Sequence, residues 1–254
     1  MAPVVDLNSD LGEGFGRWAL GDDRALLGIV TSANVACGFH AGDPSTLRRV
    51  TRWAAEAGVA VGAQVSYRDL AGFGRRPMEV PPDELRDEVL YQMGALEAFC
   101  RGAGDRLRYV KPHGALYNRC ATDPVQAGAV VAAVVDHGAG LPILGLPGSA
   151  LSDAAAAAGL RTVTEGFADR AYQADGTLVP RDRPGAVLSD ADQVAARALA
   201  LAAGKPVVAV DGTAVSIRVR SLCVHGDTPG AVALAAAVRR ALEEAGVELG
   251  PFAR

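Results

Sequence analysis

The sequence predicts an α/β fold whose parallel strands close, or nearly close, into a (β/α) barrel. Short apolar segments with strand character alternate with amphipathic helical segments along all 254 residues. Such alternation is typical of βαβ units, in which the strands are parallel. About seven repeats in a chain of this length match the ~250 residues of a typical (β/α) barrel. A doubly wound open sheet is the alternative.

The individual elements follow from composition and periodicity. Strands are expected near Pro3–Asp10, Ile29–Cys37, Gly58–Ser66, Arg108–His113, Pro142–Leu146, Leu160–Glu165, Pro206–Val210 and Leu222–His225. Helices are expected near residues 44–57, 82–102, 124–137, 150–158, 191–203 and 229–245. In the last helix an apolar face recurs at helical spacing, which is typical of packing against a core; it consists of Ala231, Leu234, Ala235, Val238, Leu242 and Ala245.

Capping signals support these helix boundaries. Three expected helices begin with a capping residue followed by Pro, at Asp43-Pro44, Asp123-Pro124 and Thr228-Pro229. Glycine stands where a left-handed helix end is needed, at Gly58, Gly138, Gly159 and Gly204. Asp227 is also expected to cap a helix, and the turns at Asp43 and Asp227 would in addition aim N–H groups at an anion.

Two segments depart from the alternation. Val207–Val210 and Val215–Val219 flank Asp211-Gly212 and predict an antiparallel hairpin inserted before the last strand. Tyr172–Ser189 is the longest irregular segment, and we expect it to form a loop over one end of the barrel. Because no linker divides the chain, residues 1–254 are expected to form a single domain.

Composition excludes several classes of protein. Half of the residues are hydrophobic and the net charge is −4, so neither a disordered chain nor a basic nucleic-acid-binding protein is expected. The four cysteines lie far apart, which favours a reducing cytoplasm over a disulfide framework. The longest apolar stretches fall short of the ~20 residues that span a bilayer, so no membrane partner is expected.

Polar residues in the first strand give the first indication of a site. Asp6, Asn8 and Asp10 alternate along it and therefore point to one side, and Glu13 follows in the turn. A buried carboxylate is costly unless it is paired or binds something. Three such groups in register favour a site over isolated structural hydrogen bonds.

Three of the four histidines also lie at predicted strand ends. His40, His113 and His225 each follow a strand and precede a helix, which is where α/β folds place ligands and catalytic groups. His137, by contrast, stands at a helix end and is interpreted as a C-terminal capping residue. Lys111 lies two residues before His113 and faces the same side of its strand.

Further charged residues follow other strands. Glu165 and Asp169-Arg170 end the sixth strand. Arg75 and Arg76 follow the third, where they could hold a carboxylate or phosphate or form a solvated surface pair. Asp10, His40 and His113 could form a carboxylate-plus-two-histidine metal set, but their long spacing leaves the presence of a metal open. The chain contains no P-loop pattern, no GxGxxG spacing and no GxSxG elbow.

Seven segments, in order along the chain, resemble the LamB/YcsF family. They are Asp6–Gly14, Thr31–Asp43, Gly62–Leu70, Gly72–Arg76, Val110–Asn118, Glu165–Arg170 and Cys223–Asp227. The sequence departs from the family pattern at Gln64, where some members have His, and at Arg68, where some have Pro. The resemblance implies a distorted seven-stranded (β/α) barrel of the glycoside hydrolase/deacetylase type.

The resemblance also implies a function: the ATP-dependent hydrolysis of the lactam of 5-oxoproline to L-glutamate, the 5-oxoprolinase reaction, carried out with two further subunits. ATP binding is expected in the complex, and the missing P-loop agrees with a partner subunit that binds the nucleotide. The alternatives are a metal-dependent deacetylase of N-acyl sugars and a non-catalytic subunit that only binds the substrate.

On this hypothesis the site lies at the C-terminal mouth of the barrel. Asp10 or Glu13 orients or deprotonates water, His40 and His113 act as acid/base or electrostatic partners, and Lys111 stabilises negative charge. Arg75 or Arg76 holds the substrate carboxylate. The remaining substrate-binding candidates are the strand-end and barrel residues Asp6, Asn8, Glu165, Arg170, His225 and Asp227.

Overall fold

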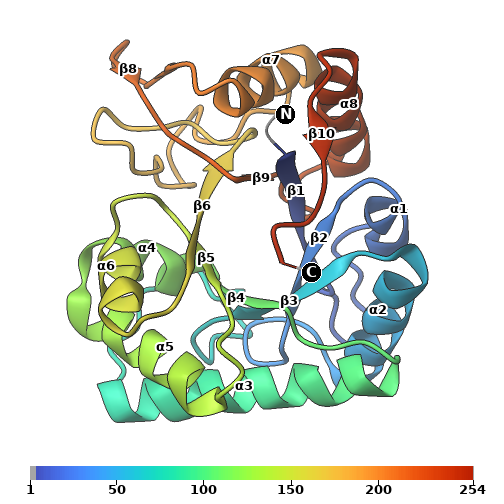
Figure 1. Ribbon diagram of the computed structural model, residues 1–254, viewed down its shortest axis with the longest axis vertical. Helices are drawn as coiled ribbons and strands as arrows, with labels where there is room; N and C mark the ends of the chain where they lie inside the picture. Colours follow the sequence, from blue (N-terminus) through green and yellow to red (C-terminus); the bar gives the residue numbers. More distant parts are fainter. Residues whose placement is uncertain (1–3, 254) are drawn as a thin grey trace.

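A computed structural model describes residues 4–253 and shows a closed barrel of parallel strands (Figure 1). Because the last barrel strand pairs back with the first, the sheet is a barrel and the open-sheet alternative is wrong. A further short strand, β10 (Glu248–Leu249), pairs with the start of β1. The seven barrel strands, in spatial order, are β1 (Val4–Leu11), β2 (Ser32–Ala36), β3 (Ala60–Val65), β4 (Tyr109–Pro112), β5 (Ile143–Gly145), β6 (Thr162–Phe167) and β9 (Ser221–Cys223).

Helices surround this barrel (Figure 1). All six expected helices are present, and most of their bounds match the predictions to within one or two residues. Two short helices, α1 and α4, were not predicted. The helices are α1 (Asp23–Leu27), α2 (Pro44–Ala57), α3 (Pro82–Gly102), α4 (Gly114–Thr122), α5 (Pro124–His137), α6 (Ala150–Ala157), α7 (Ala191–Ala202) and α8 (Ala231–Glu244).

Two of the three predicted N-terminal caps are confirmed. Asp43 accepts hydrogen bonds from the N–H groups of Ser45 and Thr46, and Asp123 caps α5 in the same way. The third prediction, at Thr228-Pro229, is wrong. Gly230, with φ of 79°, lies between Pro229 and the helix, and its left-handed backbone delays the start of α8 to Ala231. Asp227 was likewise expected to cap α8, but it pairs with arginines instead.

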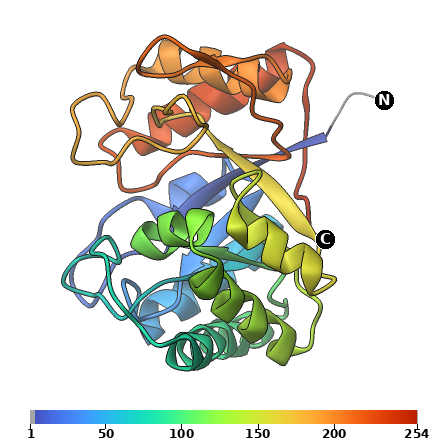
Figure 2. The ribbon, with the colours of Figure 1, turned by 90° about the vertical axis from the view of Figure 1, so that its left-hand side faces the viewer.

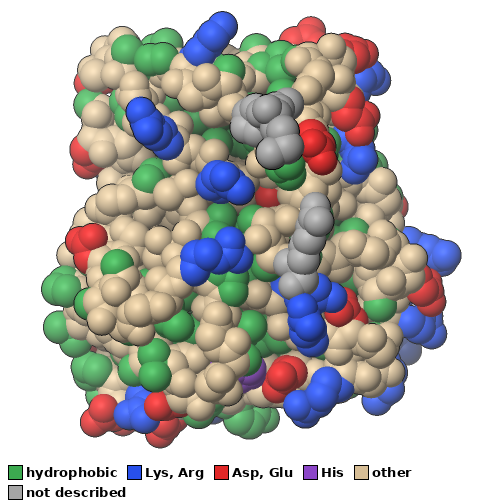
Figure 3. Space-filling model, in the orientation of Figure 1, with side chains coloured by type: hydrophobic (Ala, Val, Ile, Leu, Met, Phe, Trp, Pro, Cys, Tyr) green, Lys and Arg blue, Asp and Glu red, His purple; other side chains and the backbone are tan. Residues whose placement is uncertain are grey.

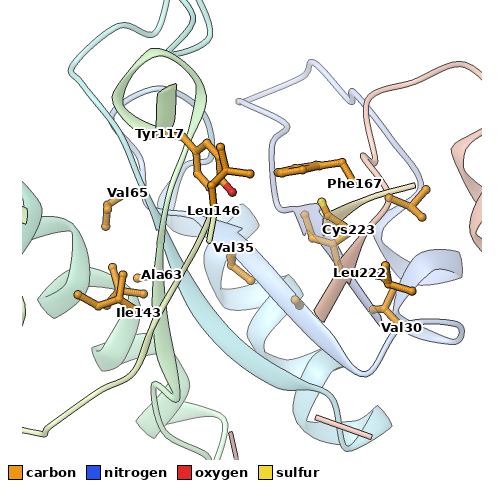
Figure 4. Close-up of a cluster of buried hydrophobic side chains, with 14 of the residues drawn as sticks. Val30, Val35, Ala63, Val65, Tyr117, Ile143, Leu146, Phe167, Leu222 and Cys223 are labelled. Carbon is orange, nitrogen blue, oxygen red and sulfur yellow. The ribbon is translucent and has the colours of Figure 1, made fainter. Parts of the chain in front are cut away.

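The hydrophobic core lies mainly between the outer face of the barrel and the helices. Alternate strand residues such as Val35, Ala63 and Leu222 are fully buried in this layer (Figure 4). The other strand residues point into the barrel, and there the sequence is polar. Register places Asp10 beside Asn34 and Gln64 beside Lys111 on neighbouring strands, so the barrel interior forms a polar column.

The predicted hairpin is confirmed as β7 (Val207–Val208) and β8 (Ala214–Val215), which pair antiparallel outside the barrel. The strand expected at Pro206–Val210 is therefore part of the hairpin, and the chain reaches the last barrel strand only at Ser221. The irregular segment after β6 contains no helix or long strand. Figure 2 shows it (yellow to orange) on the side where the strands end, which is also the side of the loop that follows β3 (teal).

Charges on the face of the molecule seen in Figure 3 are interspersed, with basic, acidic and apolar side chains next to one another. Among residues 4–253, no helix combines the length and the apolar character that crossing a bilayer requires.

Candidate functional site

A cavity of about 570 Å³ opens where the barrel strands end. It lies between the loops that follow β3 and β6, above the polar column of the barrel. This is the end of a (β/α) barrel at which active sites are built. Its polar and aromatic lining includes Asp10, Arg75, Lys111, His113, Tyr117, Asn118, Phe167, Arg170, Arg181, Asp182 and His225.

The lowest part of the polar column is built around Asp6, which is buried and does not reach the cavity. Its carboxylate accepts hydrogen bonds from the hydroxyl groups of Thr31, Ser32 and Ser221. Burial raises the pKa of Asp6 from 3.8 to about 6, although these hydroxyl groups oppose the rise. Asp6 therefore acts as an internal support of the barrel in this structure.

A consequence for stability follows from Asp6. Because its pKa is higher in the folded chain, the stability it contributes is complete below pH 3.8 and is lost as the pH rises through about 6. We expect the wild-type free energy of unfolding, relative to Asp6→Asn, to fall by up to about 3 kcal/mol between pH 4 and pH 7. Urea unfolding of both proteins at each pH measures this difference. A difference that does not change with pH would contradict the assignment.

Higher in the column, amides connect the first two strands to the cavity floor. Asn34 donates hydrogen bonds from Nδ2 to Asn8 Oδ1 at 2.7 Å and to Asp10 Oδ1 at 2.8 Å. The Tyr109 hydroxyl donates to the side-chain oxygen Oδ1 of Asn34 at 2.6 Å, and Asn8 Nδ2 donates to Ser221 Oγ at 2.6 Å. This network fixes the orientation of Asp10, whose carboxylate reaches the cavity.

Lys111 is the centre of the cavity floor. Its Nζ lies 2.8 Å from Glu165 Oε1 and 3.2 Å from Asp10 Oδ1, and all three side chains are almost fully buried. Tyr117 donates a hydrogen bond from its hydroxyl to Glu165 Oε2 at 3.0 Å. The Lys111 ammonium also lies 5.4 Å from the ring centroid of Phe167. One buried cation is thus held between two carboxylates and an aromatic face.

The charges of this floor fix its protonation states. Burial alone would lower the pKa of Lys111, but Asp10, Cys223 and Glu165 raise it well above its usual range. Burial would raise the pKa of Asp10, yet Lys111 and the nearby histidines hold it far below the usual range. Lys111 and Asp10 are therefore an ion pair across the neutral pH range. A carboxylate with so low a pKa, such as that of Asp10, is a poor base for abstracting a proton from water.

A second cluster joins Glu13, Gln64, His40 and His113. Gln64 donates from Nε2 to Glu13 Oε1 at 3.1 Å, and its Oε1 lies 3.1 Å from His40 Nε2. The ring of His40 stacks on that of His113 with 4.5 Å between centroids. Since Gln64 presents its oxygen to His40, His40 must donate from Nε2.

The pKa values in this second cluster shift in opposite directions. Burial, with the charges of Asp10 and Asp227, raises the pKa of Glu13 well above its usual range and favours a proton on it. Burial lowers the pKa of His40 to about 4, and burial together with His40 lowers the pKa of His113 well below its usual range. Both histidines are therefore neutral at pH 7. Glu13 Oε1 lies 3.7 Å from His113 Nε2, so a proton on Glu13 has a short path to the cavity.

Among residues 4–253, two groups of three side chains bring metal-ligating atoms within 4.8 Å of one another. They are Glu13, His40 and His113, and Asp10, Cys223 and His225. In the first group the two imidazole rings are stacked, and Gln64 already engages Glu13 and His40. In the second, Lys111 occupies the space beside Asp10 and Cys223. Because Gln64 and Lys111 already engage donor atoms of these two sets, we derive no chemical step through a metal ion.

His225 has a different partner. Its Nδ1 lies 3.0 Å from both carboxylate oxygens of Asp169, and its backbone N–H donates to the same carboxylate at 3.0 Å. Burial would raise the pKa of Asp169, but His225 beside it holds the pKa below the usual range. Phe167 stacks on the imidazole. Because Nδ1 donates to Asp169, the remaining lone pair of His225 is on Nε2.

Charged residues from three loops meet at the rim of the cavity. Arg75, after β3, contacts Asp227 Oδ2 at 2.5 Å, and Arg181, after β6, contacts the same atom at 3.4 Å. Arg170 lines the cavity below them. Arg76 does not join this group, because its guanidinium binds Asp69 within the loop after β3 and points to solvent.

The predicted site residues therefore fall into three sets. Asp10, Arg75, Lys111, His113, Arg170 and His225 line the cavity. Asn8, Glu13, His40, Glu165 and Asp227 contact these residues from behind or at the rim. Asp6 and Arg76 lie apart from it. The roles assigned to all of these residues stay predictions.

Several residues of the site were given no role from the sequence. Asp169 was noted beside Arg170 at the end of the sixth strand, but its pairing with His225 was not predicted. Tyr117 stands close after His113, and a search for partners of that residue could have found it. Gln64 was noted only as a departure from the family pattern. Arg181 comes from the irregular loop after β6, where no periodicity marks it.

Comparison with known proteins finds relatives over nearly the whole chain. The model of the LamB/YcsF family matches residues 5–254. Over 250 residues the chain is 66% identical to a Streptomyces coelicolor protein that is named as a 5-oxoprolinase subunit, covering 98% of this chain and 100% of that protein. These matches confirm the family resemblance seen in the motifs.

Solved structures are similar as well. A crystal structure of Lactam Utilization Protein from Thermus thermophilus has a TM-score of 0.92 and 46% identity, covering 98% of this chain and 100% of that one. A peptidoglycan N-acetylglucosamine deacetylase has a TM-score of 0.50 at 12% identity, over 98% of this chain and 86% of that one. The second likeness concerns the fold alone, and it confirms the expected deacetylase-like barrel.

Proposed function

The chain belongs to the LamB/YcsF family, and we propose that it is the subunit of a 5-oxoprolinase in whose cavity the lactam of 5-oxoproline is opened to L-glutamate. The observation that supports this most is the cavity floor, where Lys111 lies between Asp10 and Glu165. A buried ammonium group held in place by carboxylates is suited to stabilise the oxyanion that forms when water attacks a lactam carbonyl.

The reaction needs a base, an oxyanion partner and an acid. In our proposal His225 is the base, because Asp169 orients its imidazole and leaves Nε2 free to accept a proton from water. His225 thus takes the role of base that was expected for Asp10. The ion pair with Lys111 leaves the Asp10 carboxylate only weakly basic. The oxygen of that water forms the new bond to the lactam carbon, and Lys111 stabilises the resulting negative charge.

The ring nitrogen leaves when it receives a proton. Glu13 is the acid of the site, and His113 lies between it and the cavity. The C–N bond breaks, the nitrogen becomes the amine of glutamate, and the proton that His225 took from water returns to Glu13 through solvent. The opposite pKa shifts of Asp10 and Glu13 thus assign two nearby carboxyl groups to different roles.

The complex as a whole is proposed to use ATP. We assign nucleotide binding to a partner and place two partner subunits in the complex. In our proposal the partner transfers the terminal phosphoryl group of ATP to the lactam oxygen, and this chain acts on that activated lactam. Breaking the C–N bond then leaves an acyl phosphate, and a second water hydrolyses it to inorganic phosphate and glutamate. A cytoplasmic location fits the four cysteines, all of which are buried free thiols. The relative from Streptomyces coelicolor carries the word subunit in its name, which supports the existence of partners.

The test is turnover of 5-oxoproline and ATP by the purified chain alone and after its partner subunits are added. Glutamate formation is expected only when all are present. Formation of glutamate with ATP hydrolysis by the chain alone would contradict the division of labour. Hydrolysis of an N-acetylated sugar without ATP, abolished by a chelator, would instead support the deacetylase alternative.

A further inference from the structure

One wall of the cavity holds a buried guanidinium group without an acidic partner. Arg170 is 5% exposed and lines the cavity. It donates from Nε to the carbonyl oxygen of Ala186 at 3.2 Å and from Nη2 to that of Val179 at 2.6 Å. No carboxylate of residues 4–253 forms an ion pair with it. Because an uncompensated buried charge is costly, this arrangement suggests that a ligand supplies the missing negative charge.

Arg181 stands beside this group and is also incompletely paired. Its contacts with Asp227, from Nη1, are long at 3.4 and 3.5 Å. Its Nη2 is buried and makes no hydrogen bond with any described part of the chain. A buried donor without a partner loses its hydration and gains nothing in return, so it indicates a place for an acceptor.

The local charges leave an excess of positive charge. Three guanidinium groups, of Arg75, Arg170 and Arg181, face two carboxylates, of Asp182 and Asp227. Other charged groups nearby are already paired, since Asp169 binds His225 while Asp10 and Glu165 flank Lys111. Burial lowers the pKa of Arg170 to about 10, and the charges of Arg181 and Arg75 act in the same direction, while the charge of Asp169 opposes them only in part.

We propose that Arg170 and Arg181 form a subsite for an oxyanion carried by the substrate. This identification rests on the proposed function, under which the oxyanion is either the carboxylate of 5-oxoproline or the phosphoryl group of its activated form. A planar guanidinium binds either group through paired N–H donors. The subsite would hold the lactam ring over the floor formed by Lys111 and would reject lactams that carry no negative charge.

Calorimetric titration of the purified chain tests the subsite directly. The ligands are 5-oxoproline, inorganic phosphate, and 2-pyrrolidinone, which is the same lactam without the carboxylate. Arg170→Met and Arg181→Met are each expected to weaken binding of at least one of the two anions by about tenfold or more, and binding of 2-pyrrolidinone by less than about twofold. Arg101→Met, an exposed residue at the end of α3, is the matched control and should change none of them.

Competition distinguishes the two sources of the oxyanion. If phosphate displaces 5-oxoproline, the subsite takes the carboxylate; if both bind together and only phosphate binding is weakened by the variants, it takes the phosphoryl group. If Arg170→Met does not fold, as thermal unfolding would show, Arg181→Met provides the test, because Arg181 is partly exposed at the rim of the cavity.

The proposal is overturned if the wild-type chain binds neither anion, or if both variants bind the anions as wild type does. Failure of the proposed function gives a different result, namely a complex with wild-type chain that makes no glutamate from 5-oxoproline.

Discussion

Lys111→Met is expected to abolish most of the activity and to destabilise the barrel. The ammonium group neutralises two buried carboxylates, of Asp10 and Glu165, and Met leaves both without a partner. Breaking a buried ion pair by removing one member costs about 3–5 kcal/mol of unfolding free energy. Loss of the oxyanion partner should lower kcat about 10²–10³-fold. Urea unfolding and glutamate formation by the reassembled complex measure the two effects.

The other lysine of the chain provides the control. Lys205 is exposed in the loop after α7, so Lys205→Met should change neither stability nor turnover measurably. The double variant Lys111→Met/Glu165→Gln separates folding from catalysis, because it removes one of the unpaired carboxylates. It should recover part of the lost stability and none of the turnover. Turnover near the wild-type rate in a folded Lys111→Met protein would contradict the role of Lys111.

Removing the proposed base should have an effect of similar size on turnover. His225→Gln is expected to lower kcat about 10²–10⁴-fold, because the Gln amide cannot accept the proton that the imidazole is proposed to take from water. Asp169→Asn should also lower kcat strongly with little change in KM, since Asn cannot hold the imidazole in the same tautomer. Steady-state kinetics of the complex with varied 5-oxoproline measures both.

His137→Gln is the matched control for this pair. His137 ends α5, and its Nε2 lies 3.3 Å from Glu97 on the outside of the barrel. Its replacement should leave kcat within about twofold of wild type, because it touches no group that moves a proton. A His225→Gln complex that keeps the wild-type kcat would show that another group is the base.

Much of the fold could be predicted because each repeat carries its own local signals. Apolar periodicity defined α8, and Asp43-Pro44 and Asp123-Pro124 marked the starts of α2 and α5. The two missed helices lacked such signals. The five residues of α1 are too few to show a period, and α4 begins at Gly114 in a left-handed conformation. The capping pattern at Thr228-Pro229 also gave a wrong helix start, because the left-handed backbone of Gly230 moves the start of α8 to Ala231.

The site could be predicted as a region but not as a set of contacts. Parallel strands bring their carboxyl ends together, so Asp10, Lys111, His113 and His225 were expected to converge, and they line one cavity. Which residues pair depends on register and on which strands are neighbours. Asp169 reaches His225 only because β6 lies beside β9, although the hairpin separates them in sequence. The position of Arg181 depends on an irregular loop.

The most direct test of the central claim, that lactam opening takes place in the cavity of this chain, is glutamate formation by complexes rebuilt with Asp10→Asn or His113→Ala. Both residues line the cavity, and neither is expected to alter a surface that a partner contacts. With assembly verified by size-exclusion chromatography, we predict that each variant lowers turnover by more than about a hundredfold. Turnover within about threefold of wild type in both complexes would contradict the claim and would leave the chain a protein that only binds the substrate.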